Sequence, residues 1–250
     1  MKLNNGLVNK FILQFILLFV ASLSFIFSQD SFGSNINNNN PNVFINDDGS
    51  LILEITNNHS AAKASKIEYL FSMPPTTARK KWVAENKIYN LEWEDGGIKY
   101  TMSVFLNTKT FNTDFSLTVL FVKLHGENTD SEYREAKAGF SVKVDENNQR
   151  IVLKEGFVLL KDDIIAHIDI PAGCTVEQKE GRLKFSGNMP PGTTGAMVFK
   201  IPVNPLHKDN EKRWLSNLEY EEEMERLRRT DFSSDSSQKK FLESINWSEK

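Results

Sequence analysis

The 250-residue sequence contains little cysteine, little histidine and little net charge. Its single cysteine, Cys174, excludes an intrachain disulfide, so the hydrophobic core has to hold the fold. We interpret this thiol as a small buried hydrophobe at the start of a strand, with an intermolecular bridge as the alternative. The formal net charge is −3, and it becomes −5 once Lys2 and Lys10 are removed with the N-terminal segment. A mild negative charge argues against nucleic acid as a partner.

Short motifs of the common enzyme classes are also missing. The sequence has no glycine-rich phosphate loop, no Gly-x-Ser-x-Gly nucleophile turn and no acidic loop with the regular spacing of a dedicated calcium site. No cofactor is therefore expected. The absence of these motifs favours a protein that binds or supports other molecules over an enzyme.

One long apolar run is present, at the N-terminus. Lys2 and Lys10 precede the apolar stretch Phe11 to Phe27, which is typical of a secretory signal, and small residues for cleavage follow. We predict a signal peptide over residues 1–28; the alternative is an uncleaved signal anchor, because seventeen residues approach the minimum for a membrane span. Both alternatives place the rest of the chain outside the cytoplasm, in a periplasm, on a cell surface or secreted. A membrane is a partner only if the signal stays uncleaved.

An asparagine-rich linker is predicted over residues 29–42, because it has nothing to bury. Over residues 43–205 the apolar residues then alternate with polar ones, as they do from Ile98 to Asn107, and turn residues separate the alternating segments. This pattern predicts a mainly β domain, either an antiparallel two-sheet β-sandwich or a jelly roll, with a barrel as the alternative. Phe115 to Leu124 is apolar in both registers, which predicts a central strand covered on both faces.

After Pro205 the composition becomes strongly charged, and residues 206–250 are predicted to form a helical, partly disordered tail. At 100° per residue, the helix over 209–229 carries Trp214, Leu215 and Leu218 on one side and Tyr220, Met224 and Leu227 on nearly the opposite side.

We expect the Trp214 side of this helix to pack on the sandwich. The Tyr220 side would then stay partly free to bind another envelope or extracellular protein, and deleting residues 208–250 would leave the sandwich folded. The alternative is that the helix changes faces at a bend near Asn217.

Two polar pairs are candidates for chemistry. Glu92 and Glu94 project from the same face of a predicted strand, and such a carboxylate pair is what a glycoside hydrolase of jelly-roll type would use; the competing interpretation is a solvated face beside Lys99. His167 and Asp169 share the polar face of another strand and are candidate metal ligands. Two ligands on one strand are too few for a structural zinc site, so no metal is expected.

Aromatic and proline-rich segments are candidates for binding. Trp82, beside three basic residues, is the better exposed aromatic for contact with a sugar ring. The segment Met73 to Ala78 (MPPTTA) recurs as Met189 to Ala196 (MPPGTTGA), and two such stiff loops could form a rim at one end of the sandwich. The sequence as a whole favours an exported, non-catalytic binding or structural protein with protein or glycan contacts; the alternative is the carboxylate-dependent glycan hydrolase.

Overall fold

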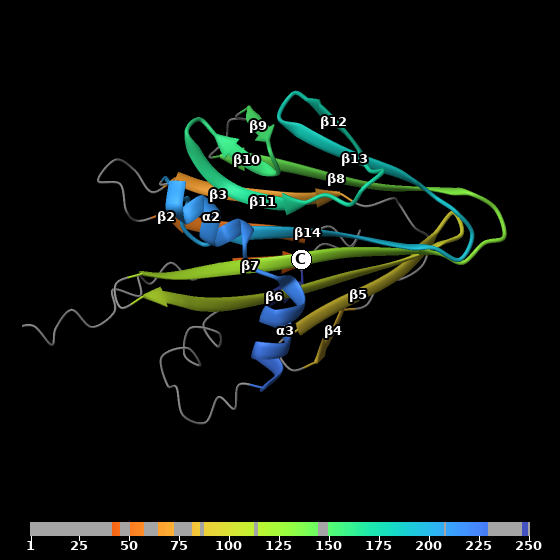
Figure 1. Ribbon diagram of the computed structural model, residues 1–250, viewed down its shortest axis with the longest axis horizontal. Coiled ribbons are helices and arrows are strands. Elements are labelled where there is room, and N and C mark those ends of the chain that lie inside the picture. Colours follow the sequence, from red (N-terminus) through yellow and green to blue (C-terminus); the bar gives the residue numbers. More distant parts are fainter. Residues whose placement is uncertain are drawn as a thin grey trace, which may run out of the picture. The chain divides into compact units, whose positions relative to one another are not determined.

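The structure is a computed structural model that describes residues 42–45, 51–57, 65–72, 82–85, 88–112, 115–144, 150–207, 209–229 and 247–249. Within these residues the chain forms two β-sheets and two short helices, and the helices follow strand β14 (Thr194–Pro202) in the chain (Figure 1). The predicted signal segment and all but Asn42 of the predicted linker lie outside the described residues. None of the helices in the described ranges is long and apolar enough to span a membrane.

Strand pairing within each sheet is antiparallel, apart from one parallel pair formed by the last strand. The seven-stranded sheet has the order β12 (Thr175–Lys179), β13 (Arg182–Met189), β8 (Arg134–Val144), β3 (Ser65–Ser72), β2 (Leu51–Asn57), β1 (Asn42–Ile45) and β15 (Trp247–Glu249). The eight-stranded sheet has the order β4 (Trp82–Glu85), β5 (Ile88–Asp95), β6 (Ile98–Asn112), β7 (Phe115–Asn128), β14 (Thr194–Pro202), β11 (Asp163–Asp169), β10 (Phe157–Leu160) and β9 (Ile151–Lys154). Two sheets confirm the predicted mainly β fold and are consistent with a β-sandwich.

The main core lies between the sheets, where the predicted alternation is confirmed. Every second residue of β6 from Ile98 to Leu106 is buried there, as expected for a strand with one face turned to the core. Three aromatic rings of the seven-stranded sheet pack around Phe199 of β14, and their centroids lie 5.1 to 5.9 Å from its ring: Phe71, Phe140 and Phe185. The Tyr69 hydroxyl of β3 also donates a hydrogen bond of 3.2 Å to the Ile165 carbonyl of β11, which ties the two sheets together.

A second core covers the outer face of the eight-stranded sheet, where α2 (Asp209–Ser216) and α3 (Tyr220–Arg229) pack (Figure 1). β7 is buried on both faces, as predicted, because its two registers serve the two cores. Period-two alternation from Ile98 to Asn107 predicts that the other register, which includes Phe105 and Asn107, is mostly exposed to solvent; for these two residues the prediction is wrong. Both are buried, because α3 covers them; the Phe105 ring lies 5.1 Å from that of Tyr220.

The charged region forms two helices instead of one. The chain bends at Asn217 and Leu218, so α2 and α3 turn their apolar sides to the same sheet. The expectation that Tyr220, Met224 and Leu227 stay partly free for a partner is therefore wrong. Tyr220 and Leu227 are 5% and 3% exposed and Met224 packs against them, so this chain's own sheet covers the surface that a partner would need. The alternative bend near Asn217 is confirmed.

Candidate ligand cavity

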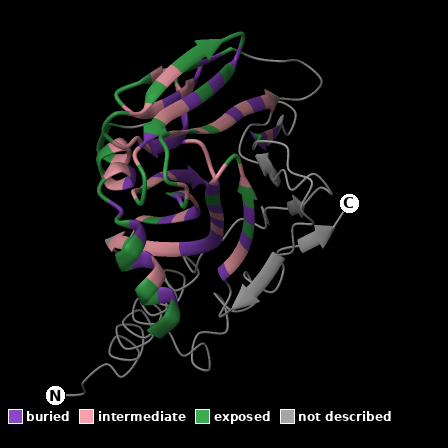
Figure 2. Ribbon diagram, turned by 90° about the vertical axis from the view of Figure 1, so that its right-hand side faces the viewer, coloured by how far each residue is buried: buried purple, intermediate pink, exposed green. Residues whose placement is uncertain are grey.

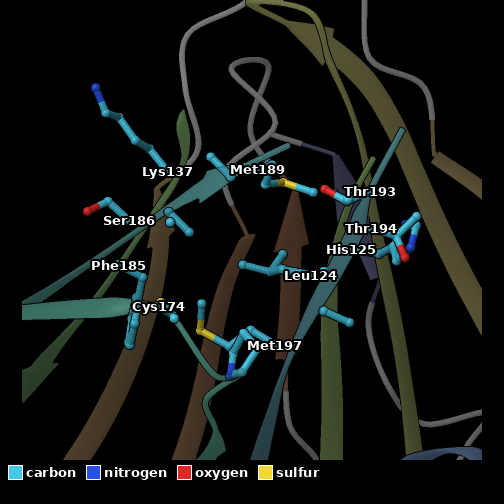
Figure 3. Close-up of a pocket in the computed structure, with 18 of the residues that line it drawn as sticks. Leu124, His125, Lys137, Cys174, Phe185, Ser186, Met189, Thr193, Thr194 and Met197 are labelled. Carbon is cyan, nitrogen blue, oxygen red and sulfur yellow. The ribbon is translucent and has the colours of Figure 1, made fainter. Parts of the chain in front are cut away.

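A cavity of about 330 Å³ lies between the two sheets at one end of the sandwich. The seven-stranded sheet contributes β8 and β13 to its wall, and the eight-stranded sheet contributes β7 and β14, with Trp93 and Tyr100 from β5 and β6. In Figure 3, Phe185 and Cys174 lie on one side of the hollow, Thr193 and Thr194 lie on the other, and Leu124 and Met197 lie between them. Most of the lining side chains are apolar or small.

The cavity exists because the inward-facing positions of four strands change from large to small at this end. Sheets pack roughly 10 Å apart, so facing glycines and alanines cannot fill the space between them. Inward-facing residues pass from Phe140 to Ala138 and Ala136 on β8, from Phe185 to Gly187 on β13, from Phe199 through Met197 to Gly195 on β14, and from Val122 through Leu124 to Gly126 on β7. Following side-chain volume along the inward register would have revealed this site, but period-two hydrophobicity alone did not.

One buried side chain braces the strand ends at the edge of the cavity. Asn128 is fully buried, and its Nδ2 donates hydrogen bonds of 2.8 Å to the carbonyls of Glu132, in the connection after β7, and of Met189, the last residue of β13. The backbone N–H of Gly192 adds a 3.0 Å bond to the Asn128 carbonyl. The second Met-Pro-Pro segment thus forms part of the cavity wall, whereas the loop residues of the first lie outside the described residues.

The polar groups of the cavity do not form a nucleophile with its base. Cys174 is half-buried, and burial raises the pKa of its thiol, so it stays protonated at neutral pH. The Tyr100 ring is stacked on that of Trp93 with centroids 5.1 Å apart, and burial raises the pKa of its hydroxyl. The Lys137 N–H donates to the Tyr100 hydroxyl over 3.4 Å. The Cys174 thiol and the Tyr100 hydroxyl are therefore protonated at neutral pH, and both residues form part of the cavity wall.

The carboxylates of Glu92 and Glu94 lie away from the cavity. Leu91 and Trp93 of β5 are buried toward the core, so the two glutamates project from the opposite, exposed face. Lys99 forms an ion pair of 3.5 Å with Glu92 across the strand pair. This arrangement agrees with the competing interpretation of the two glutamates as part of a solvated strand face.

His167 and Asp169 share one face of β11, as predicted, but their neighbour is a cation. The Lys200 Nζ lies 2.9 Å from Asp169 Oδ2 and donates a 2.8 Å hydrogen bond to the Ser216 carbonyl at the end of α2. Burial alone would raise the pKa of Asp169, but hydrogen bonds from His167 and Lys200 outweigh it and hold that pKa below its usual value. The buried ammonium group occupies the place beside Asp169 that a metal would need, so the cluster joins α2 to the sheet.

No group of three or more metal-ligating side chains lies together in the described ranges. Trp82 begins β4, where its backbone pairs with Leu91, but its side chain is outside the described part of the chain. β4 is the neighbour of β5, which carries Glu92, whereas His167 lies on β11, beyond β6, β7 and β14. No protein-family model matches this chain, and no curated protein matches it either.

Proposed function

We propose that this protein is an exported, non-catalytic binding protein and that the cavity between its sheets takes an apolar group of its ligand. The observation that carries the proposal is the hollow of about 330 Å³ lined by Leu124, Phe185, Met197 and small residues. Ligand pockets typically enclose about 300 to 1,000 Å³ and have mostly apolar walls with a few polar groups. An apolar group of roughly six methylenes would gain about 5 kcal/mol on burial, before the costs of association.

The end position of the cavity supports the same proposal. Its wall combines strands from both sheets with Pro190 and Thr193 of the connection between β13 and β14 and with residues 171–174 of the arch between β11 and β12. Binding sites commonly lie on such connections, because the sheets hold them rigidly. Asn128 fixes the end of β13 and the turn at Gly192 to the end of β7, so little ordering is left to be done when a ligand binds.

Filling the cavity is expected to abolish binding of an apolar dye. A Cβ added at Gly187 would have only Cys174 and Gly173 atoms nearby, at 3.9 Å, so Gly187→Leu can place its side chain in the hollow without a backbone clash. We expect 1-anilinonaphthalene-8-sulfonate to bind the unmodified chain with enhanced fluorescence and to bind Gly187→Leu at least tenfold more weakly.

The matched control for the dye experiment is Lys184→Leu on the same strand, whose side chain is exposed on the outer face. It adds the same leucine outside the cavity and should bind the dye as the unmodified chain does. Equal dye affinities for all three proteins would contradict the proposed cavity function.

Export is tested separately from ligand binding. If residues 1–28 act as a signal, cell fractionation should recover the protein outside the cytoplasm, with a new N-terminus near residues 22 to 28 or an intact membrane-held chain. Exchange of Leu17 and Leu18 for arginine should block export, because charges within the apolar run disrupt a signal. Recovery of the intact, unmodified chain from the cytosol would contradict this part of the proposal.

A further inference from the structure

One strand edge of the eight-stranded sheet is open beside the cavity. β14 pairs with β7 from Thr194 to Pro202, but with β11 only from Val198 to Lys200. β11 ends at Asp169, and the arch 170–174 then carries the chain to β12 in the other sheet; its Pro171 has no N–H with which to extend the ladder. In the described part of the chain, residues 194–197 of β14 therefore have a neighbouring strand on one side only.

Two hydrogen bonds show which backbone groups of β14 point toward β7. The Asn128 N–H donates to the Thr193 carbonyl over 3.0 Å, and the Val203 N–H donates to the Thr118 carbonyl over 2.9 Å. In an antiparallel ladder, successive residues direct their N–H and C=O groups to opposite sides. The odd-numbered positions from 193 to 203 thus bond to β7, and the even-numbered positions point the other way.

By this alternation, Thr194 and Ala196 direct their N–H and C=O groups to the open side. No backbone group of the described residues bonds to them there. The edge strand β9 of the same sheet is covered by a side chain. Gln178 accepts a hydrogen bond of 3.1 Å from the Leu153 N–H and donates one of 2.8 Å to the Ile151 carbonyl. The β14 edge has no such cover within the described residues.

The open edge and the apolar cavity form one site. Thr194 and Ala196 border the cavity, and residues 171–174 of the arch border it too. Figure 3 shows Thr194 and Cys174 on opposite sides of the hollow. A chain lying along β14 would direct every second side chain inward, toward Leu124 and Met197. The ligand that satisfies this site must offer backbone-like donors and acceptors together with apolar groups at a spacing of two residues.

We propose that the occupant is an extended segment of a partner protein that adds as a strand beside residues 194–197 of β14 and inserts apolar side chains into the cavity. This inference rests on the proposed function and names its ligand class. A free hydrocarbon would fill the hollow but leave the N–H groups of Thr194 and Ala196 unpaired where it shields them from water, which is costly. An added peptide strand pairs them, and its alternate side chains give specificity.

A single partner segment fits this site better than a second copy of the chain. The arch 170–174 and the turn 190–193 both border the same cavity, so the space beside β14 is flanked on two sides. One extended chain occupies about 4.8 Å beside its neighbour, whereas a whole sheet edge would have to displace the arch.

The test selects peptides from a random heptapeptide display library on the purified full chain. We expect enriched peptides with apolar residues at alternate positions, and expect the tightest synthetic peptide to lose at least tenfold in affinity when its alternate amides are N-methylated on the edge that would face β14. On the protein side, Ala196→Pro should weaken the peptide at least tenfold, because it removes one N–H and places a ring at the open edge. The matched control Ala196→Val keeps the N–H and should bind normally, and thermal melts should show that both variants fold.

The outcomes separate the inference from the proposed function. If Ala196→Pro and N-methylation leave peptide affinity unchanged while Gly187→Leu still abolishes dye binding, the edge is unused and the inference is overturned, although the cavity function stands. If the unmodified chain selects no peptides but binds the dye, a non-peptide ligand is indicated and the inference again fails. If analytical ultracentrifugation finds a dimer that Ala196→Pro converts to a monomer, the β14 edge binds a second copy of this chain, and the proposal of a different partner protein is overturned. If neither dye nor peptide binds, the proposed function itself fails.

Discussion

Ending the chain at Pro205 is expected to unfold the sandwich. The truncation removes Leu215, Leu218, Tyr220 and Leu227, which are buried against the outer face of the eight-stranded sheet. Figure 2 colours the described residues by burial and shows buried positions within helical ribbon as well as in the strands. At about 1.5 to 3 kcal/mol for each buried side chain, the loss is roughly 6 to 12 kcal/mol, comparable to the whole stability of a typical domain. Far-UV circular dichroism and thermal melting should show no cooperative transition.

The matched control for this truncation ends the chain at Arg229. It keeps both helices and the second core, so a cooperative transition should remain. Sequence patterning predicts the opposite result for the shorter truncation, because it treats the helix as an appendage on a solvated sheet. A folded, monomeric product ending at Pro205 would show that the outer face of β7 tolerates water and would contradict the role we assign to α2 and α3.

Replacement of Glu223 by alanine is expected to cost about 1 to 3 kcal/mol of unfolding free energy, the range for leaving a buried polar group without its hydrogen-bond partner. The Glu223 side chain is 3% exposed and lies 3.0 Å from Lys109 Nζ and 2.6 Å from Arg226. It also accepts a 2.9 Å hydrogen bond from Asn107 Nδ2, which is buried on β6. Without the carboxylate, two cations and a buried amide lose their common partner at the junction of α3 and the sheet.

The neighbouring Glu222 provides the control for Glu223. It is exposed, so Glu222→Ala should change the unfolding free energy by less than about 0.5 kcal/mol. Chemical denaturation of both variants measures the difference. Equal losses would mean that only the helix propensity of α3 had changed, whereas a loss confined to Glu223→Ala confirms the buried network.

The inner face of the sandwich could be predicted from the sequence because a strand's side chains alternate with a period of two. From Ile98 to Leu106 the apolar register alone identifies the residues of β6 that face the other sheet. The double apolar register of β7 likewise indicates a strand covered on both faces. What it does not indicate is the cover, because nothing in Leu117, Val119 or Phe121 specifies which segment packs over them.

The tertiary structure decided the rest. Whether Tyr220 and Leu227 face a partner or the sheet depends on the three-residue break between α2 and α3, and a helix read at a constant 100° per residue continues through it. The cavity likewise requires small inward residues of β7, β8, β13 and β14 to meet at one level between the sheets, which depends on strand register and sheet pairing. The sequence by itself determined the face to which each strand residue points, because that is local backbone geometry. Which faces meet, and where they leave space or an open edge, was decided only when strands distant in the chain came together.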